Sequence, residues 1–389
     1  MARRWWYLAA LTLSRAAMGF QFQSVAALAP LVSDTLGLDK TQLGWLIGLY
    51  LLPGVVFALP GGLLGARFGD KRLVLIGLVL MAGGATWFAL SRSLGEASAA
   101  RLTSGIGAVM LNVLLTKMVA DWFDGKERLL AMSILINSWP IGIGLALLLT
   151  GPLASLFGWR WAIESTAAFA IIGFAAVLWG YRAPASVAQG VLSKVGIGVL
   201  SRREWQLLGI ASLPWLLYNV AYQIMISFLP SFFVERGLGI SHAGRLVALN
   251  TVLFVFSVQA GGVLLKKARR PDLLCHAMMA GWCISLLALA AAETPLPWLI
   301  LAGAFAGVPA AAFVSLPAEF LRSESRGAGM GVFFTIYYLG CAALPPWAGW
   351  LYDLSGTGRT ALWMATALAA ATIPTLWLFR RSMADGRTR

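Results

Sequence analysis

The stretch that decides the fold is TQLGWLIGLYLLPGVVFALPGGLLGA, residues 41–66, which contains no Asp, Glu, Lys or Arg. A helix needs about 20 mainly apolar residues to cross the hydrocarbon core of a bilayer, so this stretch is long enough. Eleven further charge-free stretches lie at 16–33, 73–91, 102–116, 129–159, 165–181, 205–234, 246–265, 273–292, 294–318, 327–352 and 360–379. We therefore predict an all-α integral membrane protein with twelve transmembrane helices.

The overall composition agrees with this prediction. The 389 residues are 59% hydrophobic and 12% charged, whereas soluble domains are about 45–50% apolar and about 25% charged. His242 and His276 are the only histidines, and no cluster of Cys, His or carboxylate residues has metal-ligand spacing. We predict no metal site, no cofactor and no enzyme activity, because no nucleophile, base and acid form a recognisable set.

The net charge of +14 is explained by orientation. With a cytoplasmic N-terminus, 22 of the 30 Lys and Arg residues fall on inner segments and 5 on outer loops, while Arg15, Arg101 and Arg245 lie within or at the edges of spans. This asymmetry follows the positive-inside rule and predicts an inner-membrane protein with both termini in the cytoplasm. The basic loops need no nucleic-acid partner, but they favour anionic lipid at the cytoplasmic face.

An internal repeat relates the two halves of the chain. At an offset of 200, Gln23 matches Gln223, Gly37 matches Gly237 and Gly44 matches Gly244. In the later part of each half the offset is 198, and Gly158 matches Gly356. Collinear matches of this kind indicate a duplicated unit, with a binding site near the midplane between the copies. We predict a six-helix bundle at 1–181, a cytoplasmic linker at 182–204 and a second, pseudo-symmetric six-helix bundle at 205–389.

The loop between the second and third spans has the sequence GLLGARFGDKR, residues 62–72. It resembles the G-x-L-A-D-R-x-G-R-R/K signature of the major facilitator superfamily, and the resemblance covers essentially the whole chain. In that family the loop is a cytoplasmic latch. The positions that match or replace the signature are Gly62, Ala66, Arg67, Gly69, Asp70, Lys71 and Arg72.

This loop departs from the family pattern at two positions. Ala66 replaces the acidic residue, and Asp70 stands at a usually basic position. Asp70 beside Lys71 and Arg72 could supply a substitute pairing, or the latch could rest on basic groups and a helix C-terminus. The alternative interpretation is that the three basic residues only anchor the topology.

Other stretches support the same resemblance. RLTSGIGA, residues 101–108, is similar to the family's motif in helix 4, in which Gly105 and Gly107 would allow close helix approach and Arg101 would either function or snorkel to the outer surface. DWFDGKER at 121–128 and GWRW at 158–161 resemble loop patterns of the superfamily. NVLLTKMVADWF from residue 112 and NSWPIGIG from residue 137 are most similar to the cyanate and nitroimidazole permease group.

Arg15 is the first candidate for substrate contact. The resemblance implies that helices 1, 4, 7 and 10 line a central cavity, and a charge deep in helix 1 costs at least about 2.5–3.5 kcal/mol to bury. Helical periodicity places Gly19, Phe22 and Gln23 on its face, and the repeat maps that face onto Trp215, Asn219, Tyr222 and Gln223. The alternative interpretation is that Arg15 caps carbonyls or pairs within a gate.

Further polar and aromatic candidates are either substrate contacts or bonds between helices. They are Asn112, Asn137, Trp139, Tyr218, Asn250, Tyr337 and Tyr338. No carboxylate falls near the middle of a cavity helix, which disfavours a proton-driven drug exporter. We therefore predict a secondary transporter that moves a small anionic or polar organic solute by alternating access, with a coupling ion or counter-substrate as a further partner. The alternatives are a proton-coupled drug exporter, which would depend on Asp34 or Glu164, and a membrane sensor on the same scaffold.

Overall fold

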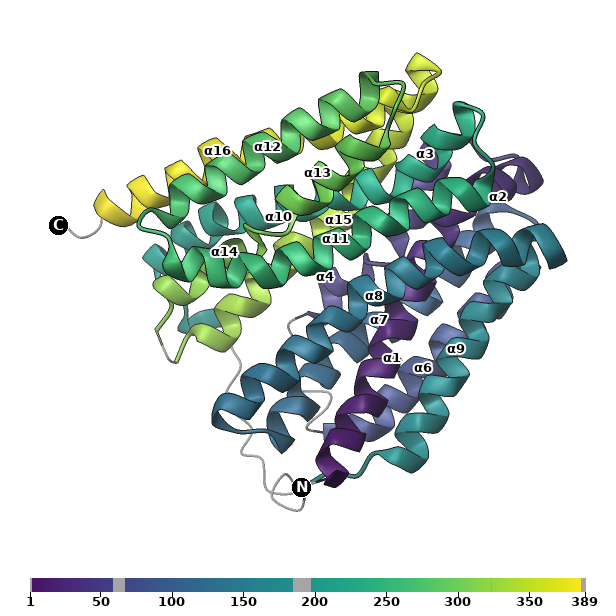
Figure 1. Ribbon diagram of the computed structural model, residues 1–389. Coiled ribbons are helices and arrows are strands. Elements are labelled where there is room, and N and C mark those ends of the chain that lie inside the picture. Colours follow the sequence, from purple (N-terminus) through teal and green to yellow (C-terminus); the bar gives the residue numbers. More distant parts are fainter. Residues whose placement is uncertain (1, 59–66, 185–196, 323, 386–389) are drawn as a thin grey trace.

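The computed structural model describes residues 2–58, 67–184, 197–322 and 324–385, and every regular element in these ranges is a helix (Figure 1). Eleven helices in the described ranges are long and apolar enough to cross a membrane, and a bent pair at the N-terminus makes twelve. The all-α membrane fold predicted from the charge-free stretches is confirmed.

The helices form two sets of six spans. The first set is α1 (Ala2–Ala27) with α2 (Ala29–Leu36), α3 (Lys40–Leu49) with α4 (Pro53–Phe57), α6 (Asp70–Leu90), α7 (Leu94–Trp122), α8 (Gly125–Phe157) and α9 (Trp159–Gly180). The turn η2 (Ile197–Val199) precedes the second set, which is α10 (Arg202–Glu235), α11 (Ile240–Lys267), α12 (Pro271–Ala291), α13 (Leu296–Ala306) with α14 (Ala310–Ser315) and η3 (Leu316–Glu319), α15 (Arg326–Ser355) and α16 (Arg359–Asp385).

Proline positions explain where some spans break. The pair α1 and α2 bends by 61° around Leu28, and Pro30 lies at the start of α2. Pro53 opens α4 after the break that follows α3. Proline lacks an amide hydrogen and clashes with the carbonyl four residues earlier, so a helix bends or restarts there. The sequence showed the spans but not these bends.

The packing repeats between the halves as the sequence predicts. Helix α1 packs on α8 and α9, and its counterpart α10 packs on α15 and α16. Two pairs of glycines related by the repeat also share a left-handed backbone at helix ends: Gly37 (φ 64°) with Gly237 (φ 88°), and Gly158 (φ 88°) with Gly356 (φ 69°). Glycine is the residue that adopts this conformation without strain. The matched glycines therefore end matched helices.

The halves meet through glycines at one end of the molecule, where α3 packs on α15 and α8 packs on α11. A Cβ added at Gly44 would lie 2.3 Å from the carbonyl oxygen of Pro345, and one at Gly244 would lie 2.3 Å from that of Leu147. We call this the closed end. Figure 1 shows the halves diverging from it toward the end that carries both termini, which we call the open end.

One carboxylate also joins the halves at the closed end. Asp353, near the end of α15, accepts hydrogen bonds from the amides of Lys40 (2.9 Å) and Thr41 (2.8 Å), the first two residues of α3. The Thr41 hydroxyl donates to the same carboxylate at 2.6 Å. The first amides of a helix have no partner within the helix, so Asp353 acts as a cap supplied by the opposite half.

Candidate functional site

Arg15 lies in the middle of α1 and donates four hydrogen bonds to other helices. Its Nε and Nη2 donate to Oδ1 of Asn112 in α7, at 3.2 and 3.0 Å. Its Nη1 donates to the carbonyls of Leu135 (2.9 Å) and Ile136 (2.8 Å) in α8. The guanidinium thus ties three helices of the first half together.

Pro140 explains why a backbone carbonyl is available to Arg15. A helical carbonyl normally accepts the amide four residues later, and for Ile136 that position is Pro140, which has no amide hydrogen. A carbonyl without a partner is costly in a membrane-embedded helix and is usually satisfied by a neighbouring group. Arg15 supplies the missing donor, so the carbonyl-capping interpretation holds for part of its contacts.

Asn112 continues the chain of hydrogen bonds into the second half. Its Nδ2 donates to the hydroxyl of Tyr338 in α15 at 2.8 Å. The Tyr338 ring is buried and lies against Gly54 of α4, where an added Cβ would come within 2.3 Å of the ring. The chain from Arg15 through Asn112 to Tyr338 therefore crosses the interface between the halves.

Aromatic rings extend from this chain along the second half. The centroids of Tyr338 and Tyr337 are 5.0 Å apart, those of Tyr337 and Trp215 are 5.9 Å apart, and those of Trp215 and Tyr218 are 6.0 Å apart. Arg15 and Trp215, which the repeat placed on matched faces, are thus linked through intermediate residues.

A second aromatic contact lies in the first half. The ring centroids of Phe22 and Trp139 are 5.3 Å apart. Arg15, Asn112, Trp139, Trp215 and Tyr337 all keep accessible surface although they lie well inside long helices. A cation, an amide and aromatic faces therefore remain partly exposed on α1, α7, α8, α10 and α15.

The charge of Arg15 is not cancelled by any contact that the described residues make. All of its hydrogen-bond acceptors are backbone carbonyls or an amide oxygen. The ion pairs among the described residues involve other side chains, for example Glu204 with Arg322 (2.9 Å). The hydrogen bond that Arg322 donates to this carboxylate raises the pKa of the arginine. The site can therefore offer one net positive charge to an anion.

Gln23 and Gln223, which match in the repeat, serve freed carbonyls in the same way as Arg15. Gln23 donates to the carbonyl of Ile226 at 2.8 Å, four residues before Pro230. Gln223 donates to the carbonyl of Cys341 at 3.1 Å, four residues before Pro345. Because each proline removes the usual amide partner, these buried glutamines support the helices.

Four other candidate residues take no part in the hydrogen bonds that run from Arg15 through Asn112 to Tyr338. Asn219 donates to the carbonyl of Trp215 in its own helix (2.7 Å), and Asn250 donates to that of Leu299 (2.8 Å). Tyr222 stacks on Phe254 with ring centroids 4.1 Å apart. Asn137 accepts a hydrogen bond from Gln259 of α11 at 3.1 Å. Sequence reasoning missed Gln259 of α11, because its partner Asn137 lies in the opposite half.

Two latch positions, Gly62 and Ala66, lie outside the described residues. Asp70 pairs with Lys117 of α7 (2.7 Å), and Lys71 donates to the carbonyls of Leu178 (2.8 Å) and Tyr181 (2.7 Å) at the end of α9. The described contacts of Asp70 and Lys71 thus lead to α7 and to the C-terminus of α9. Whether either one serves as a latch stays a prediction.

The remaining described latch positions make local contacts. Gly69 precedes α6 with φ 88°, and the Arg67 guanidinium lies 5.3 Å from the centroid of the Phe68 ring. Arg72 is exposed on the first turn of α6. These contacts all lie within the first half.

Arg101 is buried and does not snorkel. It is 2% exposed, and it donates to the carbonyls of Leu46 (3.0 Å), Gln21 (3.2 Å) and Phe22 (3.3 Å). Its guanidinium also lies 4.5 Å from the centroid of the Tyr50 ring. The snorkelling hypothesis was wrong because α7 begins at Leu94, about two turns before Arg101.

The glycines beside Arg101 permit close helix contacts. A Cβ at Gly105 would lie 2.4 Å from the carbonyl oxygen of Tyr50, and one at Gly107 would lie 2.2 Å from that of Gly77. Arg101 and these glycines therefore hold α7 against α3 and α6.

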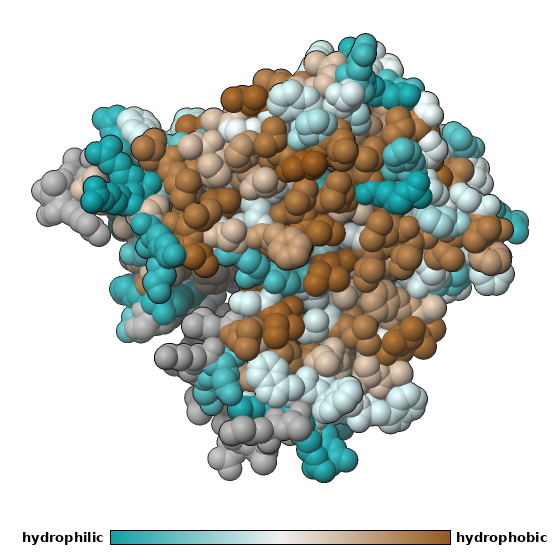
Figure 2. All heavy atoms as spheres, viewed as in Figure 1, coloured by the Kyte–Doolittle hydropathy of each residue, from teal (hydrophilic) through white to brown (hydrophobic). Residues whose placement is uncertain are grey.

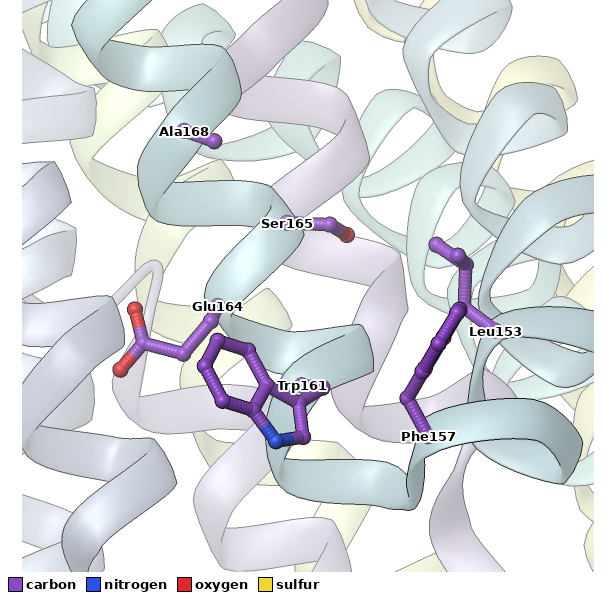
Figure 3. Close-up of a pocket in the computed structure, with 6 residues that line it drawn as sticks. All are labelled: Leu153, Phe157, Trp161, Glu164, Ser165 and Ala168. Atoms are coloured by element: carbon purple, nitrogen blue, oxygen red, sulfur yellow. The ribbon is translucent and has the colours of Figure 1, made fainter.

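A pocket of about 490 Å³ between the end of α8 and the start of α9 is separate from the central chain (Figure 3). Its ionisable residue is Glu164, which accepts a hydrogen bond from Thr86 at 2.9 Å. Trp161 and Phe157 form apolar walls, and Figure 3 shows Glu164 beside Trp161. The residues that line this pocket belong to α8 and α9, and none of them takes part in the contacts from Arg15 to Tyr338.

Comparison with known proteins agrees with the architecture. The chain is 28% identical over 364 residues to the 3-(3-hydroxy-phenyl)propionate transporter of Escherichia coli (strain K12), covering 90% of this chain and 87% of that one. It is 24% identical over 275 residues to the hexuronate transporter of Bacillus subtilis (strain 168), covering 66% of this chain and 64% of that transporter, which is less than two thirds of its length.

A solved structure has the same fold. The crystal structure of a D-xylose-proton symporter superposes with a TM-score of 0.79 over 97% of this chain and 98% of that one, at 15% identity. The family model for the Major Facilitator Superfamily matches residues 11–343. The protein is a multi-pass membrane transporter that belongs to the Major Facilitator Superfamily.

Proposed function

We propose that this transporter moves a small organic anion, with a carboxylate as the preferred charged group, by alternating access. The observation that carries the proposal is the set of contacts around Arg15. All of the acceptors are neutral, so the guanidinium is stabilised by hydrogen bonds and keeps the positive charge that attracts an anion. A hydrogen bond between a guanidinium and a carboxylate is charge-assisted and is roughly twice as strong as one between neutral groups.

The neighbouring rings favour an organic anion. Tyr337 and Trp215, whose ring centroids are 5.9 Å apart, and the partly exposed Trp139 provide apolar faces with polar edges. Binding sites for small molecules commonly combine a few fixed polar groups with such walls. The names of the two sequence relatives, a hydroxyphenylpropionate transporter and a hexuronate transporter, both denote carboxylates.

The shape of the protein supports an inward-facing state. The halves touch at the closed end and diverge toward the end that carries the termini (Figure 1). The positive-inside rule assigns the termini to the cytoplasm, so the divergent end faces the cytoplasm in this proposal. Transport then requires the halves to rock about the chain of hydrogen bonds that runs from Arg15 through Asn112 to Tyr338.

The test is uptake into proteoliposomes. Glucuronate and 3-(3-hydroxyphenyl)propionate are supplied as labelled substrates to the unmodified protein and to Arg15→Lys and Arg15→Ala. We expect Arg15→Lys to retain partial uptake and Arg15→Ala to lose at least about tenfold, since one charge-assisted hydrogen bond contributes about 1.5–3 kcal/mol. Normal uptake by correctly folded Arg15→Ala would refute the proposal.

A second measurement separates folding from binding. Thermal unfolding of each variant, with and without the same anions, shows whether a variant that fails to transport still folds and still binds. Proton-coupled export of lipophilic drugs is the competing outcome. It would appear as drug extrusion that depends on Glu164 or Asp34 and is indifferent to Arg15.

A further inference from the structure

A groove of about 880 Å³ runs between α1 and α9 at the open end. Arg3 and Arg182 line it, one near the start of α1 and the other two residues beyond the end of α9. The groove thus collects two cations from segments far apart in the sequence. It is separate from the contacts that hold Arg15.

The two arginines of the groove are exposed, and neither forms an ion pair within the described ranges. The neighbouring residue Arg4 behaves differently, because it pairs with Glu127 at 2.8 Å and lies over the ring of Phe123. Arg4 therefore makes contacts within the protein, whereas the adjacent Arg3 lines the groove. Its charge remains available to an anionic ligand.

The position of Arg182 is fixed by the backbone. Trp122 of α7 donates from its indole nitrogen to the carbonyl of Arg182 at 3.0 Å. Lys71 donates to the preceding carbonyl, that of Tyr181, at 2.7 Å. These bonds hold the chain just after α9 in place and bring the charge of Lys71 close to Arg182.

The floor of the groove is apolar and its rim is aromatic. Alanines of both helices, including Ala10 and Ala176, leave room between α1 and α9. Trp6 is 73% exposed and Trp179 is 79% exposed, and both line the groove near the arginines. Tryptophan is enriched at the level of lipid headgroups, so these rings mark the membrane interface.

The distribution of side chains over the surface agrees with this placement. Figure 2 shows apolar groups over the middle of the viewed face and hydrophilic groups toward the ends that carry the termini. A ligand in the groove would place its charged part among hydrophilic groups and its apolar part along the membrane-facing surface. A soluble phosphate would use the arginines but leave the alanine floor empty.

We propose that this groove binds one anionic phospholipid of the leaflet at the open end. The phosphate lies between Arg3 and Arg182, and an acyl chain follows the floor between α1 and α9. Basic pockets between transmembrane helices on the cytoplasmic side recognise anionic headgroups in this way. The pocket that contains Glu164 lacks basic lining and serves as an internal contrast.

Native mass spectrometry of the full-length protein provides the test. Phosphatidylglycerol is titrated into the unmodified protein, the groove variant Arg3→Gln/Arg182→Gln and the control Arg269→Gln/Arg381→Gln, which removes two exposed charges from the second half. We expect the first bound lipid to weaken at least tenfold in the groove variant and less than twofold in the control. Equal weakening in both variants would overturn the proposal, because it would indicate a diffuse charge effect.

A second measurement locates the lipid. Phosphatidylglycerol with brominated acyl chains should quench the fluorescence of the unmodified protein more than brominated phosphatidylcholine does. Trp179→Phe should reduce that difference, whereas Trp363→Phe, which changes a side chain of α16 that is 51% exposed, should preserve it. Displacement of the lipid by millimolar inorganic phosphate, or equal quenching by both lipids, would refute a phospholipid site.

Discussion

Asp353 accepts two hydrogen bonds from Thr41, one from the amide at 2.8 Å and one from the hydroxyl at 2.6 Å. The two residues belong to different halves, so their contact exists only while the closed end is closed. Asp39 caps the same helix from within the first half, because its side chain accepts the amide of Gln42. One helix start therefore has a local cap and a cap from the opposite half.

The first prediction concerns this difference. Asp353→Ala should favour separation of the halves at the closed end, because loss of a helix cap costs about 1 kcal/mol. This cost lowers the ratio of molecules in which that end is closed to those in which it is separated by about fivefold. Asp39→Ala should lower thermal stability without favouring the open state. Spin labels at Arg92 and Glu293, exposed in loops of opposite halves, report the distance in a background without the three native cysteines. An identical distance distribution for both variants would contradict this assignment.

The second prediction concerns the charge of Arg15. The amide oxygen of Asn112 lies 3.0 Å from Nη2 of Arg15. Asn112→Asp replaces this oxygen with a carboxylate oxygen, which should form an ion pair with Arg15 and neutralise its charge. Anion affinity, measured by ligand-induced thermal stabilisation, should fall at least about tenfold while the fold is retained.

Tyr338→Phe is the control for the second prediction. It removes the hydroxyl that accepts from Asn112 but leaves the charge of Arg15 exposed, so affinity should change by less than about threefold. An equal loss of affinity in both variants would mean that the bond between the halves, and not the charge, governs binding.

The third prediction concerns the glycine contact at Gly44. Gly44→Ala adds a Cβ only 2.3 Å from the carbonyl oxygen of Pro345 and should wedge the closed end apart. Overpacking of this kind costs about 1–3 kcal/mol, which amounts to about fivefold or more in the closed population. Gly83→Ala is the matched control, because nothing lies within 4 Å of its added Cβ. The Arg92 and Glu293 labels should separate more often in the first variant and not in the second.

The fourth prediction concerns the carbonyls that prolines leave free. Gln23→Leu removes the donor to Ile226 and should destabilise the protein by about 1–3 kcal/mol, the cost of a buried polar group without a partner. Adding Pro230→Ala restores an amide at the usual helical position, so the double variant should recover much of that stability. Thermal unfolding of the single and double variants measures the coupling. Additive losses would show that Gln23 acts in another way.

Sequence and structure agree best where a rule is local. The length of each charge-free stretch predicts a membrane span, because it depends on that helix alone. The matched positions of Gly37 and Gly237 predict the symmetry of the two halves, because each glycine ends one helix. Arg15 was identified as a candidate because it lies deep within the first predicted span. The depth of Arg101 was misjudged, because the charge-free test began that span at residue 102 while the helix begins at Leu94.

Contacts between helices were harder to foresee. Proline spacing identifies Ile136 as a carbonyl without a partner, yet nothing local says that Arg15 reaches it. Gln259 and Asp353 were missed because their partners, Asn137 and Thr41, lie in the opposite half. Tertiary geometry decides such pairs, and a single sequence does not contain it in a local pattern.

The neutral acceptors around Arg15 have an electrical consequence. Dipoles stabilise a charge without cancelling it, so Arg15 keeps its positive charge in the unloaded protein. Under the proposed function, a bound monoanion would neutralise that charge. An elementary charge that crosses the full field of the membrane is worth about 2.3 kcal/mol per 100 mV. Voltage should therefore act on the return of the empty protein far more strongly than on the loaded step.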